Sequence, residues 1–391
     1  MQRIIIANQH VVPVFVDVVN AFSKGADEYH ISLVAGSIEI GGSEVSDRVK
    51  IVNSVRYNRK STASRLISWF GFTIHFGLYL LTAKKVNHVL TVTNPPFVPI
   101  VTNWLLRLKR QSHHHIVLYD LYPEAAVQAG VLKETSIFAK WWRAWNINAF
   151  KNAHSIFTLS QSMKMAALRY GNPEQITVVN NWADSSYIKP FPKSDNSFAV
   201  EHGWVSKKVV LYSGNMGLTH DLESLVKAAE KLRDRNDVLF VLVGEGAKKK
   251  LLVEFVERQR LTNFLFLPYQ NREIFPKVVA AADIGVVTLG QGAEGISVPS
   301  KTYINMAAGL CLLSISPTES ELSRLISDYN VGMNCQPGDV ESVVNAILFL
   351  VDNPDVLESY KKSALVAVAN FTPRNARKYV SKVLDKNYEY L

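Results

Sequence analysis

The chain has very few cysteines, and this scarcity excludes two kinds of structure. Of its 391 residues, only Cys311 and Cys335 are cysteine. Two cysteines cannot build a disulfide framework or a cysteine-rich metal site, and such low use is typical of a reducing compartment. We therefore expect a cytoplasmic protein, and its 48% of hydrophobic residues is enough to build an extensive core.

Signals of bound cofactors and metals are also missing. The first apolar run, Ile4-Ile5-Ile6-Ala7, continues into Asn8-Gln9-His10 instead of Gly-x-Gly-x-x-Gly, so a dinucleotide oxidoreductase is disfavoured. These polar residues also interrupt the run too early for a signal peptide, and we interpret the run as a buried strand. No Asp-x-Asp pair ends a predicted strand. The triplet His113-His114-His115 begins one, but consecutive strand residues point to opposite faces. We expect no metal and no cofactor.

The chain carries an excess of positive charge, with a formal net charge of +9. This charge would attract any polyanion, whether nucleic acid, anionic lipid headgroups or a phosphorylated substrate. Because no nucleic-acid-binding module is recognisable, we expect no nucleic acid. An anionic membrane surface or a diphosphate ligand is the favoured partner.

Short β-branched runs alternate with longer segments of helical period, which is the pattern of an α/β fold. The runs are continuously apolar, as in parallel sheets that are buried on both faces. We predict eleven strands: 4–7, 31–35, 89–92, 116–119, 156–159, 176–179, 209–212, 238–243, 264–267, 284–289 and 311–315.

A polar, proline-punctuated stretch at 187–197 is the best candidate for a linker between two halves. We predict a Rossmann-like N-terminal domain over 1–190 and a Rossmann-like C-terminal domain over 191–367. A last helical segment, 368–391, returns to the first domain. Two doubly wound parallel sheets that face each other across a cleft would place a ligand at the carboxyl ends of both. The sequence does not predict an oligomeric state.

Three loops of the second half place glycines between a predicted strand and a predicted helix. The first loop contains Gly214 and Gly217, and Asp221 is a suitable N-cap for the helix that follows. Glycines let backbone N–H groups approach an anion, and the helix N-terminus adds partial positive charge. The alternative interpretation is an ordinary strand-to-helix turn.

The second and third loops add basic residues. The second, Val243–Lys250, has three lysines in the first turn of a helix, where the helix dipole disfavours cations. This conflict predicts an anionic partner for at least one of them, and the alternative is a solvated basic helix start. The third, Gly290–Lys301, ends with Ser300 as a possible helix cap and with Lys301 as a cation suited to a pyrophosphate. Gly309 would terminate the helix that follows.

Together these features resemble glycosyltransferase family 4, over almost the whole chain and most strongly from 205 to 340. In the first half, Asp120 to Glu124 resembles the family's Asp-Leu-Trp-Pro-Glu segment, and Val179–Asp184 resembles its hinge. The matching segments of the second half are Gly214-Asn215-Met216-Gly217, Gly244-Glu245-Gly246-Ala247-Lys248, Leu267-Pro268-Tyr269, Ser297 to Tyr303 and Ala307-Ala308-Gly309. The resemblance implies the GT-B fold and a retaining transferase. Many members act in bacterial surface-polysaccharide assembly, for example of lipopolysaccharide, capsule or exopolysaccharide.

The resemblance also implies that the C-terminal domain binds a nucleoside diphosphate sugar. The residues that it assigns to the donor are Gly214, Asn215, Gly217, His220, Lys248, Tyr269, Glu294, Ser297, Val298, Ser300 and Lys301. Two departures concern the donor. Asn215 and His220 stand where the family has Arg and Lys. The second Glu of the family's Glu-x7-Glu pattern falls on Thr302 when it is counted from Glu294, or on Ile304 when it is aligned back from Ala307-Ala308-Gly309, and neither residue is acidic.

Catalysis in such a transferase would proceed by front-face attack assisted by the departing phosphate. Asp120 or Glu124 would orient or deprotonate the acceptor hydroxyl. A metal is not required if lysine and helix N-termini neutralise the leaving diphosphate. The alternative for Asp120 is a purely structural role as the cap of the following turn.

The segment Leu66–Ala83 is 18 residues long and has no formal charge. It just meets the minimum length of a transmembrane helix, but Ser68, Thr73 and His75 lower its apolarity. We consider three alternatives for it, namely a buried or cleft-lining helix, an interfacial helix and a membrane span. Interleaved aromatic and cationic residues at 104–110 and 140–145 favour interfacial contact, and the alternative is core packing of the tryptophans.

The sequence thus predicts a cytoplasmic enzyme that is peripheral at the inner face of the plasma membrane. It would move a sugar from a nucleoside diphosphate donor to a polyprenyl-diphosphate-linked saccharide acceptor. One alternative is a nucleotide-sugar epimerase or hydrolase of the same fold. Another is a non-catalytic nucleotide-sugar-binding protein.

Overall fold

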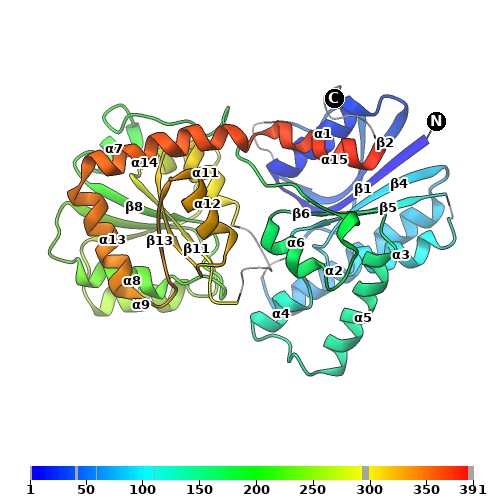
Figure 1. Ribbon diagram of the computed structural model, residues 1–391, viewed down its shortest axis with the longest axis horizontal. Helices are drawn as coiled ribbons and strands as arrows, with labels where there is room; N and C mark the ends of the chain where they lie inside the picture. Colours follow the sequence, from blue (N-terminus) through cyan, green and yellow to red (C-terminus); the bar gives the residue numbers. More distant parts are fainter. Residues whose placement is uncertain (1, 40–42, 59, 110, 293–298, 386–391) are drawn as a thin grey trace. The chain divides into compact units, whose positions relative to one another are not determined.

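The computed structural model describes residues 2–39, 43–58, 60–109, 111–292 and 299–385 (Figure 1). The chain divides into two compact units. Unit 1 contains residues 2–181 and 373–385 of the described chain, and unit 2 contains 182–292 and 299–372. Each unit is an α/β structure built on its own sheet.

Unit 1 is built on a seven-stranded parallel sheet with the strand order β3-β2-β1-β4-β5-β6-β7. Its strands are β1 (Gln2–Val11), β2 (Tyr29–Ile38), β3 (Val49–Asn53), β4 (Val86–Val92), β5 (His113–Leu118), β6 (Ser155–Thr158) and β7 (Ile176–Val178). Its helices are α1 (Pro13–Gly25), α2 (Thr62–Thr82), α3 (Val98–Leu106), α4 (Glu124–Gln128), α5 (Ile137–Lys151), α6 (Gln161–Ala167) and α15 (Arg377–Leu384), with short 3-10 turns at Pro173–Gln175 and Pro373–Ala376. Helix α15 lies beside α1.

Unit 2 is built on a six-stranded parallel sheet with the strand order β10-β9-β8-β11-β12-β13. Its strands are β8 (Lys208–Ser213), β9 (Val238–Val243), β10 (Phe264–Leu267), β11 (Ile284–Thr288), β12 (Cys311–Ile315) and β13 (Gly332–Cys335). Its helices are α7 (Ser197–Glu201), α8 (Glu223–Lys231), α9 (Lys249–Arg258), α10 (Phe275–Ala280), α11 (Lys301–Ala307), α12 (Glu321–Tyr329), α13 (Val340–Asp352) and α14 (Pro354–Ala367), with a 3-10 turn at Val368–Asn370.

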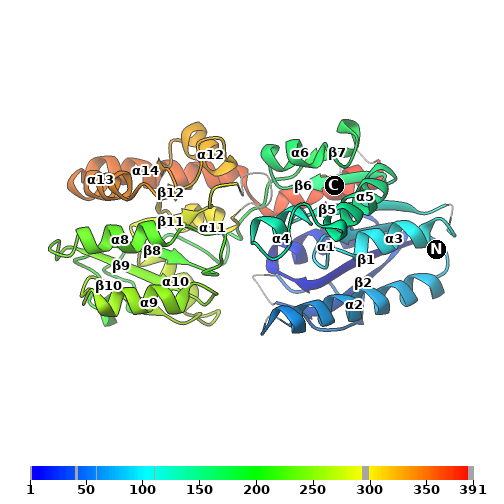
Figure 2. The same ribbon diagram turned by 90° about the horizontal axis from the view of Figure 1, so that it is seen from below.

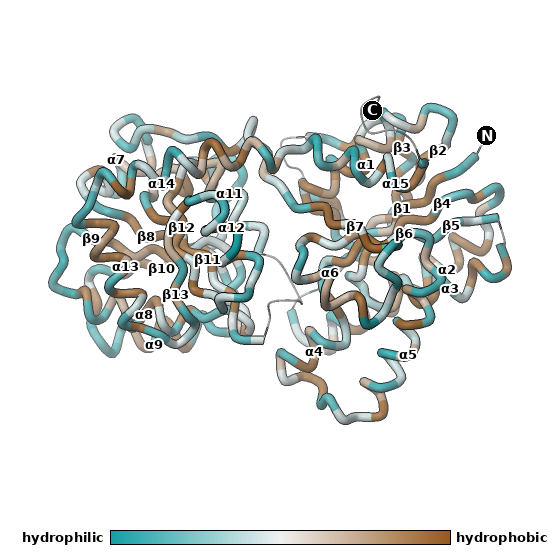
Figure 3. Tube along the Cα trace, viewed as in Figure 1, coloured by the Kyte–Doolittle hydropathy of each residue, from teal (hydrophilic) through white to brown (hydrophobic). Residues whose placement is uncertain are grey.

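Apolar strands form the centre of each unit, and the hydropathy of the chain is highest along them (Figure 3). Strands such as β9 and β12 are almost entirely buried because helices cover both faces of the sheet, which explains their uninterrupted apolar sequences. The predicted α/β class, with two doubly wound parallel sheets, is confirmed.

The sheets contain two strands that the sequence did not predict. Strand β3 lies at the edge of its sheet and is largely exposed, so its sequence is not continuously apolar. Strand β13 is a short edge strand, Gly-Met-Asn-Cys, whose glycine and asparagine are poor strand formers. Several predicted strands also end one residue earlier in the structure, since Tyr119, Leu159, Val179 and Leu289 lie outside β5, β6, β7 and β11.

The uncharged segment Leu66–Ala83 forms most of helix α2. The helix starts at a capping box in which Ser61 and Ser64 satisfy each other's backbone N–H groups. Trp69, Phe72 and Phe76 are on its inward face and are buried in the core of unit 1. No helix in the described ranges combines the length and the apolarity that crossing a bilayer requires.

Candidate functional site

The three glycine loops of unit 2 meet at the carboxyl ends of neighbouring strands. In this sheet β8 lies between β9 and β11, and the strand order changes direction there. Such a switch point is where open α/β sheets bind their ligands. The loop after β8 contains Gly214, the loop after β9 contains Gly244, and the loop after β11 contains Gly290.

Backbone hydrogen bonds join these loops beyond the ends of the strands. The Gly214 N–H donates to the Val243 carbonyl oxygen at 2.9 Å, and the Met216 N–H donates to the Glu245 carbonyl oxygen at 2.8 Å. The Gly290 N–H donates to the Thr219 carbonyl oxygen at 2.7 Å. The first loop is therefore fixed to both of its neighbours.

Two of the glycines are required by this close approach. Gly244 has a φ of +135°, and a Cβ there would lie 2.1 Å from the Gly214 carbonyl oxygen. Gly246 has a φ of +155°, and its Cβ would lie within 2.6 Å of the Met216 backbone. Any other residue would force the first two loops apart.

Lys301, the first residue of α11, is the unusual cation of the site. Its Nζ is buried and has no hydrogen-bond partner among the described residues. It lies 3.8 Å from the centroid of the Tyr212 ring, and a Cβ on Gly214 would be 3.1 Å from it. Burial lowers the pKa of Lys301 to about 7. A buried ammonium without an acceptor is costly, so this position is suited to an anion.

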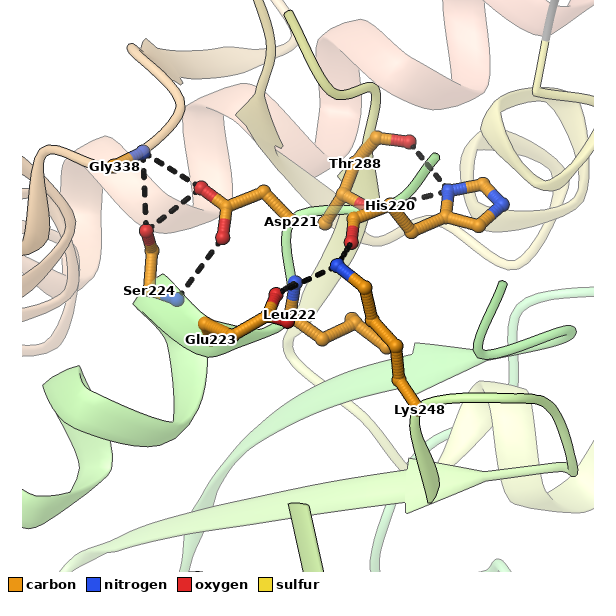
Figure 4. Close-up of polar contacts among 8 residues, drawn as sticks. All are labelled: His220, Asp221, Leu222, Glu223, Ser224, Lys248, Thr288 and Gly338. Atoms are coloured by element: carbon orange, nitrogen blue, oxygen red, sulfur yellow. Dashed lines mark hydrogen bonds and ion pairs between the residues drawn. The ribbon is translucent and has the colours of Figure 1, made fainter. Parts of the chain in front are cut away.

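His220 lies at the end of the first loop but adds no charge at neutral pH. Its Nδ1 donates to the Thr288 carbonyl oxygen at 2.9 Å, which ties the first loop to β11 (Figure 4). Burial is the main cause that lowers the pKa of His220 to about 4. The ring is therefore neutral and cannot act as the cation that the family has near this position.

The three lysines of the second loop have anionic partners, and these are glutamates of the protein itself. The Lys248 Nζ lies 2.9 Å from Glu223 Oε2 and donates to the His220 carbonyl oxygen at 2.6 Å (Figure 4). Lys249 pairs with Glu245, and Lys250 lies 3.9 Å from Glu254. The helix-dipole conflict at the start of α9 is thus resolved within unit 2.

Asp221 holds the start of α8. Its Oδ1 accepts from the Ser224 N–H at 3.1 Å, and its Oδ2 accepts from the Ser224 hydroxyl and from the Gly338 N–H (Figure 4). The predicted capping hydrogen bond is present, although the helix itself begins at Glu223. This network anchors the N-terminus of α8, the helix that follows the first loop.

The remaining predicted donor residues of unit 2 are in different surroundings. Asn215 is exposed at the tip of the first loop, and Gly217 packs against its side chain. Tyr269 is 53% exposed, and its ring edge would lie 3.3 Å from a Cβ on Gly244. Ser300 is at the N-cap position of α11, but the predicted capping bond is absent because its backbone is already helical. Glu294, Ser297 and Val298 lie outside the described residues.

Asp120 follows β5 in unit 1, and its carboxylate makes no hydrogen bond within the described chain. Its N–H donates to Thr93 Oγ1 at 3.3 Å. Burial raises the pKa of Asp120 to about 6. The structural alternative, that Asp120 caps the following turn, is wrong: α4 has Pro123 at its N-cap position and no side-chain cap. Asp120 is thus a carboxylate poised to exchange a proton near neutral pH.

Glu124 is in contrast held by several groups of unit 1. Its Oε1 lies 3.0 Å from Arg143 Nε, accepts from the Tyr170 hydroxyl at 2.5 Å and lies 3.8 Å from Arg169. The Glu124 side chain is only 11% exposed. This ion pair fixes α4 to α5 and leaves the carboxylate less available than that of Asp120.

The histidine triplet of β5 divides between the two faces of its sheet. His115 contacts His88 with ring nitrogens 3.1 Å apart, and His114 contacts Thr91 instead. Within the described ranges, no group of three His, Cys, Asp or Glu side chains is arranged to hold a metal ion.

Sequence reasoning missed Tyr212, whose ring contacts the Lys301 ammonium, and Thr288, which orients His220. Both are at the carboxyl ends of central strands, and that position was a usable signal. Their partners lie between 68 and 89 residues away in the sequence, so the contacts themselves come only from the fold.

Comparison with known proteins finds a family that is similar to the second half of the chain. Residues 195–365 match the family described as "Glycosyl transferases group 1". A Pseudomonas aeruginosa protein named as the probable glycosyltransferase WbjE is 28% identical over 75% of this chain and 73% of its own length. WcaI of Escherichia coli (strain K12), whose name connects it with colanic acid biosynthesis, is 26% identical over 62% of this chain and 56% of its own.

A solved structure shows the same fold over almost the full length. Anabaena HepE, solved in complex with UDP-glucose, has a TM-score of 0.75 and 14% identity, and the match covers 98% of this chain and 100% of HepE. Over residues 195–365 the chain is therefore similar to the group 1 glycosyl transferases, and it is a glycosyltransferase with the GT-B fold.

Proposed function

We propose that this protein is a retaining glycosyltransferase whose donor is held by the three joined loops of unit 2. The observation that carries the proposal is the buried, unpartnered Nζ of Lys301 beside Gly214. The diphosphate of a nucleotide sugar supplies the missing anion, and backbone N–H groups of a glycine loop are suited to add hydrogen bonds. Lys301 and these backbone groups also offset the charge of the leaving diphosphate, so that no metal is needed.

The nucleoside end of the donor is assigned to the surroundings of Tyr269. This exposed ring adjoins the second loop and offers a face on which a base can stack. Because HepE was solved with UDP-glucose, uracil is the base that we propose. Lys248 is already paired with Glu223. We therefore propose that it stabilises the conformation of the loop and contacts the diphosphate only at its periphery.

The acceptor is assigned to unit 1, with Asp120 as the general base. A carboxylate with a pKa of about 6 is largely ionised at pH 7 and yet basic enough to take the proton of a sugar hydroxyl. Glu124 is bound by Arg143 and Tyr170, and we give it a positioning role. Retention follows from front-face attack assisted by the departing phosphate.

We further propose a polyprenyl-diphosphate-linked saccharide as the acceptor, in the assembly of a cell-surface polysaccharide. The name of WcaI, which connects that relative with colanic acid, supports this role. A lipid-linked acceptor would also place the enzyme at the inner face of the plasma membrane.

A thermal-shift panel of UDP, GDP and ADP sugars tests donor binding. A donor at 100 times its Kd stabilises the fold by about 2.7 kcal/mol and raises the midpoint. We expect a uridine nucleotide sugar to give the largest shift. If no nucleotide sugar shifts the midpoint, the proposed donor site is wrong.

An assay of product formation separates transfer from other reactions on the same donor. We expect nucleotide release only when a lipid-linked saccharide acceptor is present, with the sugar recovered on the acceptor in the α configuration if an α-linked donor is used. Release or isomerisation without any acceptor would instead identify a hydrolase or an epimerase.

A further inference from the structure

Helix α2 exposes an apolar stripe on the side opposite to its buried face. Ile67 is 72% exposed, Ile74 is 63% exposed and Leu78 is 59% exposed, and Phe70 and Leu81 are on the same stripe. These residues recur every three or four positions along the helix. A helix of 21 residues is about 31 Å long, so the stripe is far larger than a single exposed side chain.

Helices α3 and α5 extend this apolar surface. Helix α3 lies beside α2, and α5 lies beside α3, on one side of unit 1 (Figure 2). Trp104, at the end of α3, and Trp141, on α5, are 46% and 59% exposed. The Trp145 ring lies between them, with centroids 6.0 Å and 6.5 Å away. We call the exposed apolar residues of these three helices the α2–α3–α5 surface.

The charged side chains on these three helices are all positive. Residues 48–119, which include α2 and α3, contain eleven Lys and Arg and no Asp or Glu. Because the whole chain has a net charge of +9, its remaining residues have a net charge of −2. Helix α5 also lacks acidic residues and carries Lys140 and Lys151, whereas its Arg143 is paired with Glu124. Helices α2 and α3 therefore lie in the segment of the chain that carries the excess positive charge.

A basic cavity of about 500 Å³ adjoins the surface where α3 and α5 end. Arg107 and Lys151 line it together with His113, His114 and His154, and no acidic side chain of the described residues does. Burial lowers the pKa of His114 to about 3 and also lowers that of His154, so these two rings add no charge at neutral pH, whereas Arg107 and Lys151 are charged. Leu108, the residue next to Arg107, is 75% exposed.

An anionic bilayer matches these properties more closely than a protein partner does. Interfacial helices typically combine aromatic and aliphatic side chains with an excess of lysine and arginine, which contact lipid phosphates. The inward face of α2 is packed in the core of unit 1, so the helix can lie along a membrane but cannot enter it end-on.

We propose that the α2–α3–α5 surface docks this enzyme on an anionic phospholipid bilayer. Helix α2 lies in the plane of the membrane, with Ile67, Phe70 and Ile74 among the acyl chains. Arg107 and Lys151 contact headgroup phosphates. This inference deepens the proposed function because it names the surface through which the enzyme would reach a lipid-linked acceptor. Only this link to the acceptor rests on the proposed function.

Flotation of the full-length chain with vesicles tests the proposal. We expect binding to vesicles of phosphatidylcholine with phosphatidylglycerol, and much weaker binding to phosphatidylcholine alone or at high salt. The double variant Ile67→Ser with Ile74→Ser should weaken binding about tenfold or more, because two large apolar side chains no longer insert. Leu251→Ser with Val366→Ser is the matched control, since these exposed residues of α9 and α14 are outside the surface.

A charge variant and two independent readouts complete the test. Arg107→Gln with Lys151→Gln should reduce binding to anionic vesicles and leave the weak binding to neutral vesicles unchanged. The donor thermal shift should be the same in all variants, which confirms their folding and separates this test from that of the donor site. No vesicle binding, equal binding of the Ile67 and Ile74 variant, or a self-association that this variant abolishes would each overturn the proposal.

Discussion

The two candidate sites of this protein are built in different ways. The site of unit 2 is made mainly of backbone, because glycine loops after β8, β9 and β11 are joined by hydrogen bonds and contain one buried cation, Lys301. The site of unit 1 is made of side chains, with Asp120 free and Glu124 bound to Arg143. The comparison teaches that glycine spacing in the sequence can predict the candidate donor site, whereas a candidate catalytic carboxylate is recognised only by its surroundings in the fold.

The strongest test of this comparison is Asp120→Asn. If Asp120 is the general base, kcat/KM should fall about 10²- to 10⁴-fold, because the amide cannot accept the proton. The donor thermal shift should persist, since the loops of unit 2 are unchanged. Transfer at a rate close to that of the wild type would show that another group acts as the base.

Gly244→Ala tests the backbone character of the unit 2 site. The added Cβ would lie 2.1 Å from the Gly214 carbonyl oxygen, so the first loop must move. A displacement of about 1 Å can cost roughly 10²-fold in rate, and we expect a loss of this size together with weaker donor binding.

Gly203→Ala is the control for backbone strain alone. Gly203 also has a positive φ, of +68°, but nothing lies within 4 Å of its Cβ position. This variant should lose some stability and keep its activity. If the two variants behaved alike, the contact between the loops would not be the important property of Gly244.

Glu124→Gln sharpens the contrast between the two carboxylates of unit 1. Arg143 and Tyr170 would lose a charged acceptor in a largely buried position, and the free energy of unfolding should fall by about 1–3 kcal/mol. Urea unfolding measures this change. We expect kcat to fall far less than in Asp120→Asn, and a comparable loss would contradict the positioning role.

The smallest predicted effect is the pH dependence of donor binding. In the free protein burial lowers the pKa of Lys301 to about 7, and a bound diphosphate would raise it again. Lys301 must then take up a proton on binding at any pH between these two pKa values. Donor affinity should be constant below pH 7 and fall above it, by at most about tenfold per pH unit. Calorimetry in buffers of different ionisation enthalpy measures the proton uptake directly, and an affinity that rises between pH 7 and 9 would contradict this prediction.

Much of the fold and part of the site could be predicted from the sequence. Continuous apolar runs predicted the central strands, and glycines after them predicted the loops. Edge strands β3 and β13 were missed because exposure removes the apolar signal. The pairing of Lys248 with Glu223 and the contact of Lys301 with Tyr212 join residues 25 and 89 positions apart, so only the packed structure reveals them. The low accessibility that raises the pKa of Asp120 has no sequence signature either.

The most direct test of the central claim is calorimetric titration of a uridine nucleotide sugar into three proteins. The wild type and Lys249→Met should bind it alike, because Lys249 pairs with Glu245 and has no role at the diphosphate. Lys301→Met should bind about 10- to 100-fold more weakly, since hydrogen bonds to charged groups contribute about 1.5–3 kcal/mol. Equal affinities for the wild type and Lys301→Met would contradict a donor site built around Lys301.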